Sequence, residues 1–302
     1  RKKEAVTERL VNAVYQAAQD THRSQPAIPK PVKAVIRAGQ TPHAALLHTT
    51  DWQCGKATKD FNSTILGERL HLMMDKAAIL SNRHGNPTTI GHILLGGDMI
   101  EGITIFPTQP WEVDSGLFIQ LFTVVRYIQT IIDKALTIWP QVHITSKWGN
   151  HGRIGKFGDI PDIDNLDRMA YHMAAERYRN EPRVTWDSLN TDYVQQVHIG
   201  NYHAALLHGN EFNRTASAQR IVTKLTAWQT LHGFGDTYIG HFHRRDCYGL
   251  PNGTMAYLTG SPESSNSYAA DQLAAQSNPS QRLHFVDPVE GRVVAEHILW
   301  LN

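Results

Sequence analysis

The 302 residues suffice for one large domain or two smaller ones, and the hydrophobic share of 41% is ordinary for a globular protein. A formal charge of +1, from 29 basic and 28 acidic side chains, excludes a strong global field for nucleic acid or anionic membranes. Two cysteines exclude a disulfide framework, and no run approaches the roughly 20 apolar residues that span a bilayer, so we expect a cytoplasmic protein without a membrane partner.

The first predicted element is an amphipathic helix from Glu4 to about Asp20, where apolar residues recur at helical spacing. A linker containing several prolines follows at Gln25–Pro31, because proline fixes φ and removes backbone donors. We therefore expect residues 1–32 to form an N-terminal appendage and residues 33–302 to form the main domain. The absence of an initiator methionine is consistent with a lost upstream module.

In the first half of the main domain, short apolar runs alternate with segments of helical periodicity. The predicted strands are Ala44–His48, His92–Leu95 and Val142–Thr145, and the predicted helices are Leu66–Leu80 and Gly116–Ile138. Such alternation is typical of a layered α/β domain with a partly parallel sheet.

The second half is richer in strand-like runs. They are Val197–Ile199, Ala204–Leu207, Thr237–Ile239, Met255–Leu258, Leu283–Val286 and Val293–Leu299. The last two are joined across Pro288–Gly291, which predicts a closing hairpin. The sequence therefore predicts an α/β fold in which a two-sheet β-sandwich is flanked by helices.

Polar side chains that can bind metal follow five of the apolar runs. They are Asp51 with Gln53, Asp98, Asn150 with His151, His208, and His241 with His243. Because the carboxyl ends of strands line the ligand crevice of an open α/β sheet, we expect these groups to converge. Oxygen and imidazole ligands together suit Mn, Fe, Zn or Ni, and a pair of such cations promotes phosphate-ester hydrolysis.

The order of these blocks resembles the signature of calcineurin-like metallophosphoesterases. The family's blocks read D-x-H, G-D-x-x, G-N-H, a single H and G-H-x-H, and their counterparts here lie within residues 44–260. Thr259-Gly-Ser261 is also similar to the family's closing block. The resemblance implies a four-layer αββα fold and two divalent metal ions, Mn first and otherwise Fe, Zn, Ni or Mg. It also implies attack on a phosphate ester by a metal-bound hydroxide.

The resemblance further assigns a role to each residue. One metal would take Asp51, Gln53, Asp98 and His243, and the other Asp98, Asn150, His208 and His241. Asp98 would bridge the two ions, while His151 would donate a proton to the leaving oxygen or pair with the phosphoryl group. Arg153, Arg244 and Arg245 either grip phosphate oxygens or form a solvated basic face.

Two positions depart from the family pattern. Gln53 stands where the family has histidine, so the first metal site should be weaker or altered in preference. Gly152 stands where many relatives carry an acidic residue, so another group must orient His151. The second departure also argues against a phosphoprotein phosphatase.

Several alternatives stay open. The chain resembles most the phosphodiesterase and repair-nuclease branches of bacterial or bacteriophage origin, which favours DNA or RNA ends, or a nucleotide, as substrate. The alternatives are a phosphomonoesterase acting on a small molecule or phosphoprotein, and a non-catalytic scaffold with a degraded first metal site. A homodimer is compatible with the sequence.

Individual residues also have ordinary structural interpretations. Taken singly, Asp51 or Asp98 fits a strand-end cap. We expect Cys54 to pack in the core and Lys56 to lie on the surface. The segment Asn210–Arg214 begins a predicted helix that continues through Trp228. This segment either lines the bottom of the substrate cleft or only packs against the rest of the domain.

Overall fold

The computed structural model describes residues 26–106, 108–155, 161, 163–187, 193–213, 216–263 and 278–302. The chain divides into two compact units, Arg1–Lys30 and Pro31–Asn302, and the strands and helices with assigned bounds belong to the second unit. The helix predicted for Glu4–Asp20 lies outside the described residues. Among the residues described, no helix combines the length and the apolar character needed to cross a membrane.

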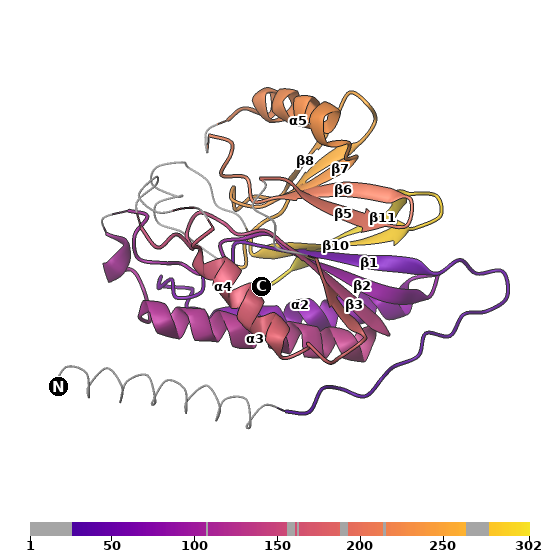
Figure 1. Ribbon diagram of the computed structural model, residues 1–302, viewed down its shortest axis with the longest axis horizontal. Helices are drawn as coiled ribbons and strands as arrows, with labels where there is room; N and C mark the ends of the chain where they lie inside the picture. The colour runs from indigo at the N-terminus through magenta and orange to yellow at the C-terminus, as the bar shows by residue number, and fades with distance from the viewer. Residues whose placement is uncertain are drawn as a thin grey trace. The chain divides into compact units, whose positions relative to one another are not determined.

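The first sheet contains six strands in the order β11-β10-β1-β2-β3-β4 (Figure 1). Their bounds are β1 His43–Thr49, β2 Thr88–Leu95, β3 Gln141–Ser146, β4 Val184–Trp186, β10 Ser280–Asp287 and β11 Arg292–Trp300. Strands β1 to β4 pair in parallel, whereas β10 runs antiparallel to β1 and to β11. The predicted closing hairpin is therefore confirmed.

The second sheet contains five strands in the order β5-β6-β7-β9-β8. Their bounds are β5 Gln195–Ile199, β6 Tyr202–Leu207, β7 Asp236–Ile239, β8 Asp246–Gly249 and β9 Met255–Leu258. Strands β6, β7 and β9 run parallel at the centre of this sheet, so their carboxyl ends lie along one edge.

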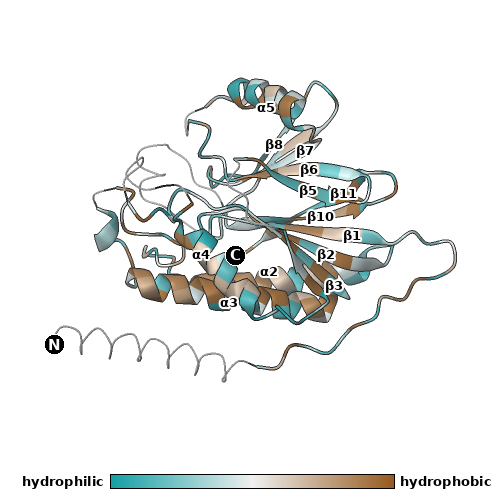
Figure 2. Cartoon of the chain, viewed as in Figure 1, coloured by the Kyte–Doolittle hydropathy of each residue, from teal (hydrophilic) through white to brown (hydrophobic). Residues whose placement is uncertain are grey.

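Helices cover the sandwich on both sides (Figure 1). They are α2 Ser63–Arg83, α3 Leu117–Ile138 and α4 Leu166–Glu176 beside the first sheet, α5 Ala218–His232 on the second, and the short 3-10 helix η1 Gln109–Trp111. Helix α2 buries the apolar face predicted for it, which includes Leu66, Met73 and Ala77. Figure 2 shows apolar residues concentrated along α3 and the strands of the first sheet.

The core between the sheets joins Ala44, Leu46 and Leu94 of the first sheet to Leu206 and Tyr238 of the second. Helix α5 packs on the outer face of the second sheet through a separate apolar cluster. This cluster includes Ile221 and Leu225 of α5 and Leu207, Ile239 and Leu258 of the sheet. The layers are thus helices, sheet, sheet and helix, which confirms the predicted α/β sandwich flanked by helices.

Four elements, α4, β4, β8 and the 3-10 helix η1, have no counterpart in the prediction from the sequence. Strands β4 and β8 have only three and four residues, too few for a clear alternating pattern. Helix α4 buries Asp167 as well as apolar residues, so its inward face does not read as a simple apolar stripe.

Candidate metal centre

The predicted ligands lie just beyond the carboxyl ends of β1, β2, β3, β6 and β7, so both sheets contribute to one site. The side chains of Asp51, Gln53, Asp98 and His208 are almost completely buried, although each is polar. Buried polar groups are costly unless they have partners or a bound ion. The convergence expected from the sequence is therefore present.

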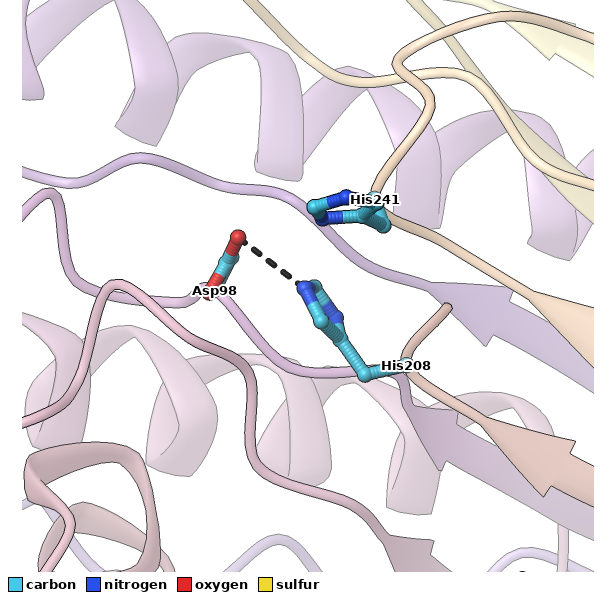
Figure 3. Close-up of side chains that lie close together, drawn as sticks. All are labelled: Asp98, His208 and His241. Atoms are coloured by element: carbon cyan, nitrogen blue, oxygen red, sulfur yellow. Dashed lines mark ion pairs between the residues drawn. The ribbon is translucent and has the colours of Figure 1, made fainter. Parts of the chain in front are cut away.

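Four of the predicted ligands meet at the ends of β2, β3, β6 and β7. His208 Nε2 lies 3.0 Å from Asp98 Oδ2 and 3.3 Å from Asn150 Oδ1. Asp98, His208 and His241 each offer one ligand atom, and these atoms all lie within 4.8 Å of one another. Figure 3 shows the three side chains pointing toward a common point from three separate segments.

The other predicted ligands meet beside β1. His243 Nε2 lies 3.5 Å from Asp51 Oδ1 and 3.4 Å from Gln53 Nε2. Gln53 Oε1 is buried and has no hydrogen-bond partner within the described part of the chain. An amide oxygen left in this way can serve as a metal ligand.

The donor spacing fits bound cations. Two ligand atoms that each lie about 2.0–2.2 Å from one ion are separated by about 3–3.5 Å at the angles metals prefer. The spacings at His208 and at His243 fall in that range. Asp98, Asn150, His208 and His241 therefore fit a metal, and Asp51 and His243 have a pair spacing that suits a second one.

The backbone at the site is strained. Among the described non-glycine residues, positive φ occurs at Asp51 (55°), Gln53 (48°), Asp98 (51°), His241 (66°) and His243 (52°). All five are predicted ligands. The left-handed region costs roughly 1–2 kcal/mol per residue and persists where the surrounding structure enforces it, typically at functional sites.

Glycines let the loops approach the carboxylates. A Cβ atom on Gly149 would lie 2.0 Å from Asp98 Oδ1, and one on Gly240 would lie 2.7 Å from Asp51 Oδ2. Neither position can hold a larger residue without displacing a predicted ligand. This explains why glycine precedes the ligand in two of the sequence blocks.

Hydrogen bonds orient the groups before any ion binds. Gly96 O lies 2.8 Å from His208 Nδ1, which places the proton there and turns Nε2 toward Asp98. The backbone N–H of His241 donates to both Asp51 oxygens at 2.9 Å, and the N–H of His151 donates to Asp98 Oδ1 at 2.7 Å.

His208 and Asp98 form an ion pair. Burial disfavours the charged imidazole, but the adjacent Asp98 carboxylate outweighs burial and raises the pKa of His208 to about 10. Burial by itself would raise the pKa of Asp98, but the adjacent His208 outweighs burial and holds this pKa far below its usual range. A ligating histidine must be neutral, so a divalent ion would take the place of the His208 proton.

Glu101 is the group that orients His151. His151 Nδ1 lies 2.7 Å from the Glu101 carbonyl oxygen, 3.5 Å from Glu101 Oε2 and 3.3 Å from Gln109 Nε2. Glu101 is fully buried, and burial raises the pKa of its carboxyl. Because Nδ1 is occupied, Nε2 is the nitrogen that can face a substrate. The orienting group that Gly152 does not supply thus comes from the loop after β2.

Asp167 at the start of α4 ties two ligand loops together. Its Oδ1 accepts from the backbone of Met99 and Ile100 at 3.1 and 3.2 Å, and its Oδ2 accepts from Gly149 at 3.0 Å. Burial, with Asp98 nearby, raises the pKa of Asp167 to about 6. Asp167 is absent from the predicted site residues; the available signal in the sequence was Asn165, the side-chain N-cap of α4.

Asn165 also explains the glycine after His151. Its Nδ2 donates to Gly149 O at 2.9 Å, and a Cβ atom on Gly152 would lie 2.4 Å from Asn165 Oδ1. An acidic side chain at position 152 therefore has no room while Asn165 caps α4.

The prediction for Lys56 was wrong, whereas that for Cys54 is confirmed. Lys56 is buried, not on the surface, and its Nζ lies 2.8 Å from Glu263 Oε1. Glu263 Oε2 also lies 3.2 Å from His243 Nδ1, and although burial opposes it, the contacts with His243 and Lys56 hold the pKa of Glu263 at about 2. Cys54 is fully buried in the core.

The three arginines occupy different surroundings. Arg153 is half-buried beside Asn165, and Arg244 and Arg245 are exposed. The Arg244 guanidinium lies 5.5 Å from the centre of the Phe242 ring and donates to Tyr248 Oη at 3.1 Å. The Arg245 guanidinium lies 5.0 Å from the centre of the Trp300 ring. A role for these arginines in phosphate binding stays a prediction.

The segment after His208 leads to a cavity of about 520 Å³. Its lining includes Glu211, Phe212, Arg220 and Lys224. Phe212 is buried and packs 6.4 Å, between ring centres, from Phe242. Within the predicted segment, Phe212 packs in the apolar cluster beside α5, and Glu211, Phe212 and Asn213 line the cavity. Arg214 lies outside the described residues.

No protein-family model and no curated protein matches the chain. Its structure is similar to Vps29 from Entamoeba histolytica complexed with zinc, with 12% identity, a TM-score of 0.38 and coverage of 85% of this chain and 99% of that one. It is also similar to Vacuolar Protein Sorting 29 from Cryptosporidium parvum, with 15% identity, a TM-score of 0.41 and coverage of 85% of this chain and 97% of that one. A third similar structure is a predicted phosphoesterase from Streptococcus pneumoniae, with 9% identity, a TM-score of 0.34 and coverage of 85% of this chain and 97% of that one. Because these identities and TM-scores are low, the fold class and the candidate site are assigned from the sheets and side chains of this chain itself.

Proposed function

We propose that this chain is a metal-dependent phosphoesterase of the calcineurin-like superfamily that uses two divalent cations. The observation that carries the proposal is the left-handed backbone at five predicted ligands, which converge with Asn150 and His208 at the strand ends. Strain of this kind marks a site that the fold enforces for a function. The mixed oxygen and imidazole donors favour Mn, with Fe, Zn, Ni and Mg as alternatives.

The division of labour follows from the contacts. Asp51, Gln53 and His243 would hold one cation and Asn150, His208 and His241 the other, with Asp98 shared. Bound cations supply positive charge for the phosphoryl oxygens and lower the pKa of water. His151, fixed through Nδ1 by Glu101, would present Nε2 to the leaving oxygen and give it a proton.

Phosphodiesters are the substrate class that we favour, as DNA or RNA ends or as a nucleotide. Asn165 excludes an acidic side chain at Gly152, which is the phosphatase-type residue. The exposed Arg244 and the half-buried Arg153 would contact phosphate oxygens. The near-neutral charge opposes tight nonspecific binding of duplex nucleic acid.

A phosphomonoesterase is the second candidate, and a scaffold without catalysis is the third. The buried Glu101 behind His151 opposes the scaffold, because its Oε2 atom has no hydrogen-bond partner among the described residues and lies 3.5 Å from His151 Nδ1. A buried carboxylate oxygen without a partner costs free energy, whereas a structural carboxylate such as Asp167 is satisfied by backbone donors.

The test compares bis-p-nitrophenyl phosphate with p-nitrophenyl phosphate. EDTA-treated protein should be inactive, and added Mn²⁺ should restore hydrolysis, faster for the diester. Activity that survives metal removal would contradict the metal mechanism. A faster monoester reaction would favour the phosphomonoesterase, and no turnover with either ester despite tight Mn²⁺ binding would favour the scaffold.

A further inference from the structure

A buried ion-paired cluster lies behind His243. Glu263 Oε2 is 3.2 Å from His243 Nδ1, and Glu263 Oε1 is 2.8 Å from Lys56 Nζ. Glu263 is 4% exposed and Lys56 is 6% exposed, so solvent screens neither contact well. Neither residue belongs to the ligand set predicted from the sequence.

We propose that Glu263 is a positioning residue that fixes His243 for the weaker of the two metals, and that Lys56 holds Glu263 in place. The inference rests on the proposed metal site. A carboxylate that accepts from one ring nitrogen of a histidine fixes its tautomer and makes the other nitrogen a better ligand.

The geometry gives His243 a defined direction. With the proton on Nδ1 facing Glu263, the lone pair of Nε2 faces Asp51 and Gln53 at 3.5 and 3.4 Å. Gln53 offers only a neutral amide at this metal, which donates less strongly than an imidazole. A more basic His243 would offset part of that loss.

Hydrogen bonds fix Glu263 to the same loop as the ligands. Ser261 Oγ donates to the Asp51 carbonyl at 2.6 Å and accepts from the Glu263 backbone at 2.9 Å. The next residue, Pro262, accepts from Arg69 Nη1 at 2.5 Å. The backbone of Glu263 is therefore linked through Ser261 to the backbone of Asp51.

Lys56 is fixed equally firmly on the other side. Its backbone N–H donates to the Gln53 carbonyl at 3.0 Å, and its backbone pairs with Val113. Lys56 and Gln53 thus belong to one turn. A buried carboxylate without a cationic partner would be strongly destabilised, so the 2.8 Å contact with Lys56 Nζ holds the Glu263 side chain in place beside His243.

The experiment is calorimetric Mn²⁺ titration of EDTA-treated protein. Wild type should show two binding steps. Glu263→Gln should weaken the weaker step by about 10- to 100-fold and leave the stronger step within about twofold. Lys56→Met should weaken the same step by a smaller factor. The matched control is Glu296→Gln, which removes a carboxylate near Arg282, outside the site, and should change neither step.

The outcomes separate the inference from the proposed function. If wild type binds no Mn²⁺, the proposed function fails. If wild type binds in two steps and Glu263→Gln binds identically, or loses the stronger step instead, the inference fails. Should Glu263→Gln not fold, nitrogen-15 NMR of zinc-loaded wild type decides. His243 should carry its proton on Nδ1, and a proton on Nε2 would overturn the assignment.

Discussion

At the scale of single residues, the strained backbone and the buried carboxylates have a common explanation. A left-handed Asp98 or Asp51 turns its oxygens away from the strand and toward the loops of the other sheet. Because each such residue costs about 1–2 kcal/mol, the metal-free protein stores strain that bound cations would offset. Metal loading should therefore raise thermal stability as well as activity.

His151→Ala should lower turnover by roughly 10²-fold or more while metal content stays unchanged, because a general acid contributes about that much. Steady-state kinetics with metal analysis by mass spectrometry measures both quantities. Asp98→Asn is the contrasting variant, since it removes charge shared by both proposed cations and should reduce metal content. Loss of metal from His151→Ala would show that His151 is itself a ligand.

Gln53→His should tighten the weaker Mn²⁺ step, because an imidazole nitrogen binds a transition metal more strongly than an amide oxygen does. The substitution adds little strain, since histidine is among the residues that tolerate the left-handed φ of 48° found at this position. Calorimetry of both proteins gives the comparison. An unchanged weaker step in Gln53→His would mean that position 53 does not limit the site.

At the scale of elements, the site depends on how strand-end loops are joined to one another. The loop after β2 and the loop after β3 share the Asp167 carboxylate at the start of α4. The loop after β1 is joined to the loop after β7 through Asp51 and the His241 backbone. Close approach of these loops requires glycine at positions such as Gly149.

Gly149→Ala should destabilise the protein by about 1–3 kcal/mol and reduce metal binding, because the added methyl group would collide with the Asp98 carboxylate. Urea unfolding and Mn²⁺ calorimetry measure the two effects. Gly85→Ala is the matched control, since nothing lies within 4 Å of a Cβ there, and it should stay within about 0.5 kcal/mol of wild type. Equal stability of the two variants would contradict the close approach.

At the scale of the whole molecule, local patterns predicted the strands that position the site, and long-range contacts decided the rest. Strand β1 contains the apolar run Ala44–Leu47, and the polar residues Asp51 and Gln53 follow within six positions, so both signals are local. Lys56 could not be predicted, because its burial depends on Glu263, which is more than 200 positions away in the sequence. The role of Asp167 could not be predicted for the same reason, because its hydrogen-bond partners belong to two other loops.

Buried neutral histidines should make the metal-free molecule sensitive to acid. His92 on β2 lies outside the proposed ligand set, and burial, reinforced by His143, lowers its pKa to about 3. Between pH 3 and the ordinary histidine pKa of 6.5, the unfolded chain binds a proton that the folded chain does not. The stability contributed by neutral His92 is therefore present above about pH 6.5 and is lost progressively as the pH falls toward 3.

His92→Gln should flatten this dependence. Below pH 6.5 the free energy of unfolding of wild type should fall by up to about 1.4 kcal/mol per pH unit more than that of the variant. Urea unfolding of both EDTA-treated proteins from pH 8 to pH 5 measures the difference. Above pH 7.5 the two curves should differ only by a constant offset, because the imidazole is neutral in both states there. Parallel curves below pH 6.5 would show that His92 has the same pKa in the folded and unfolded states.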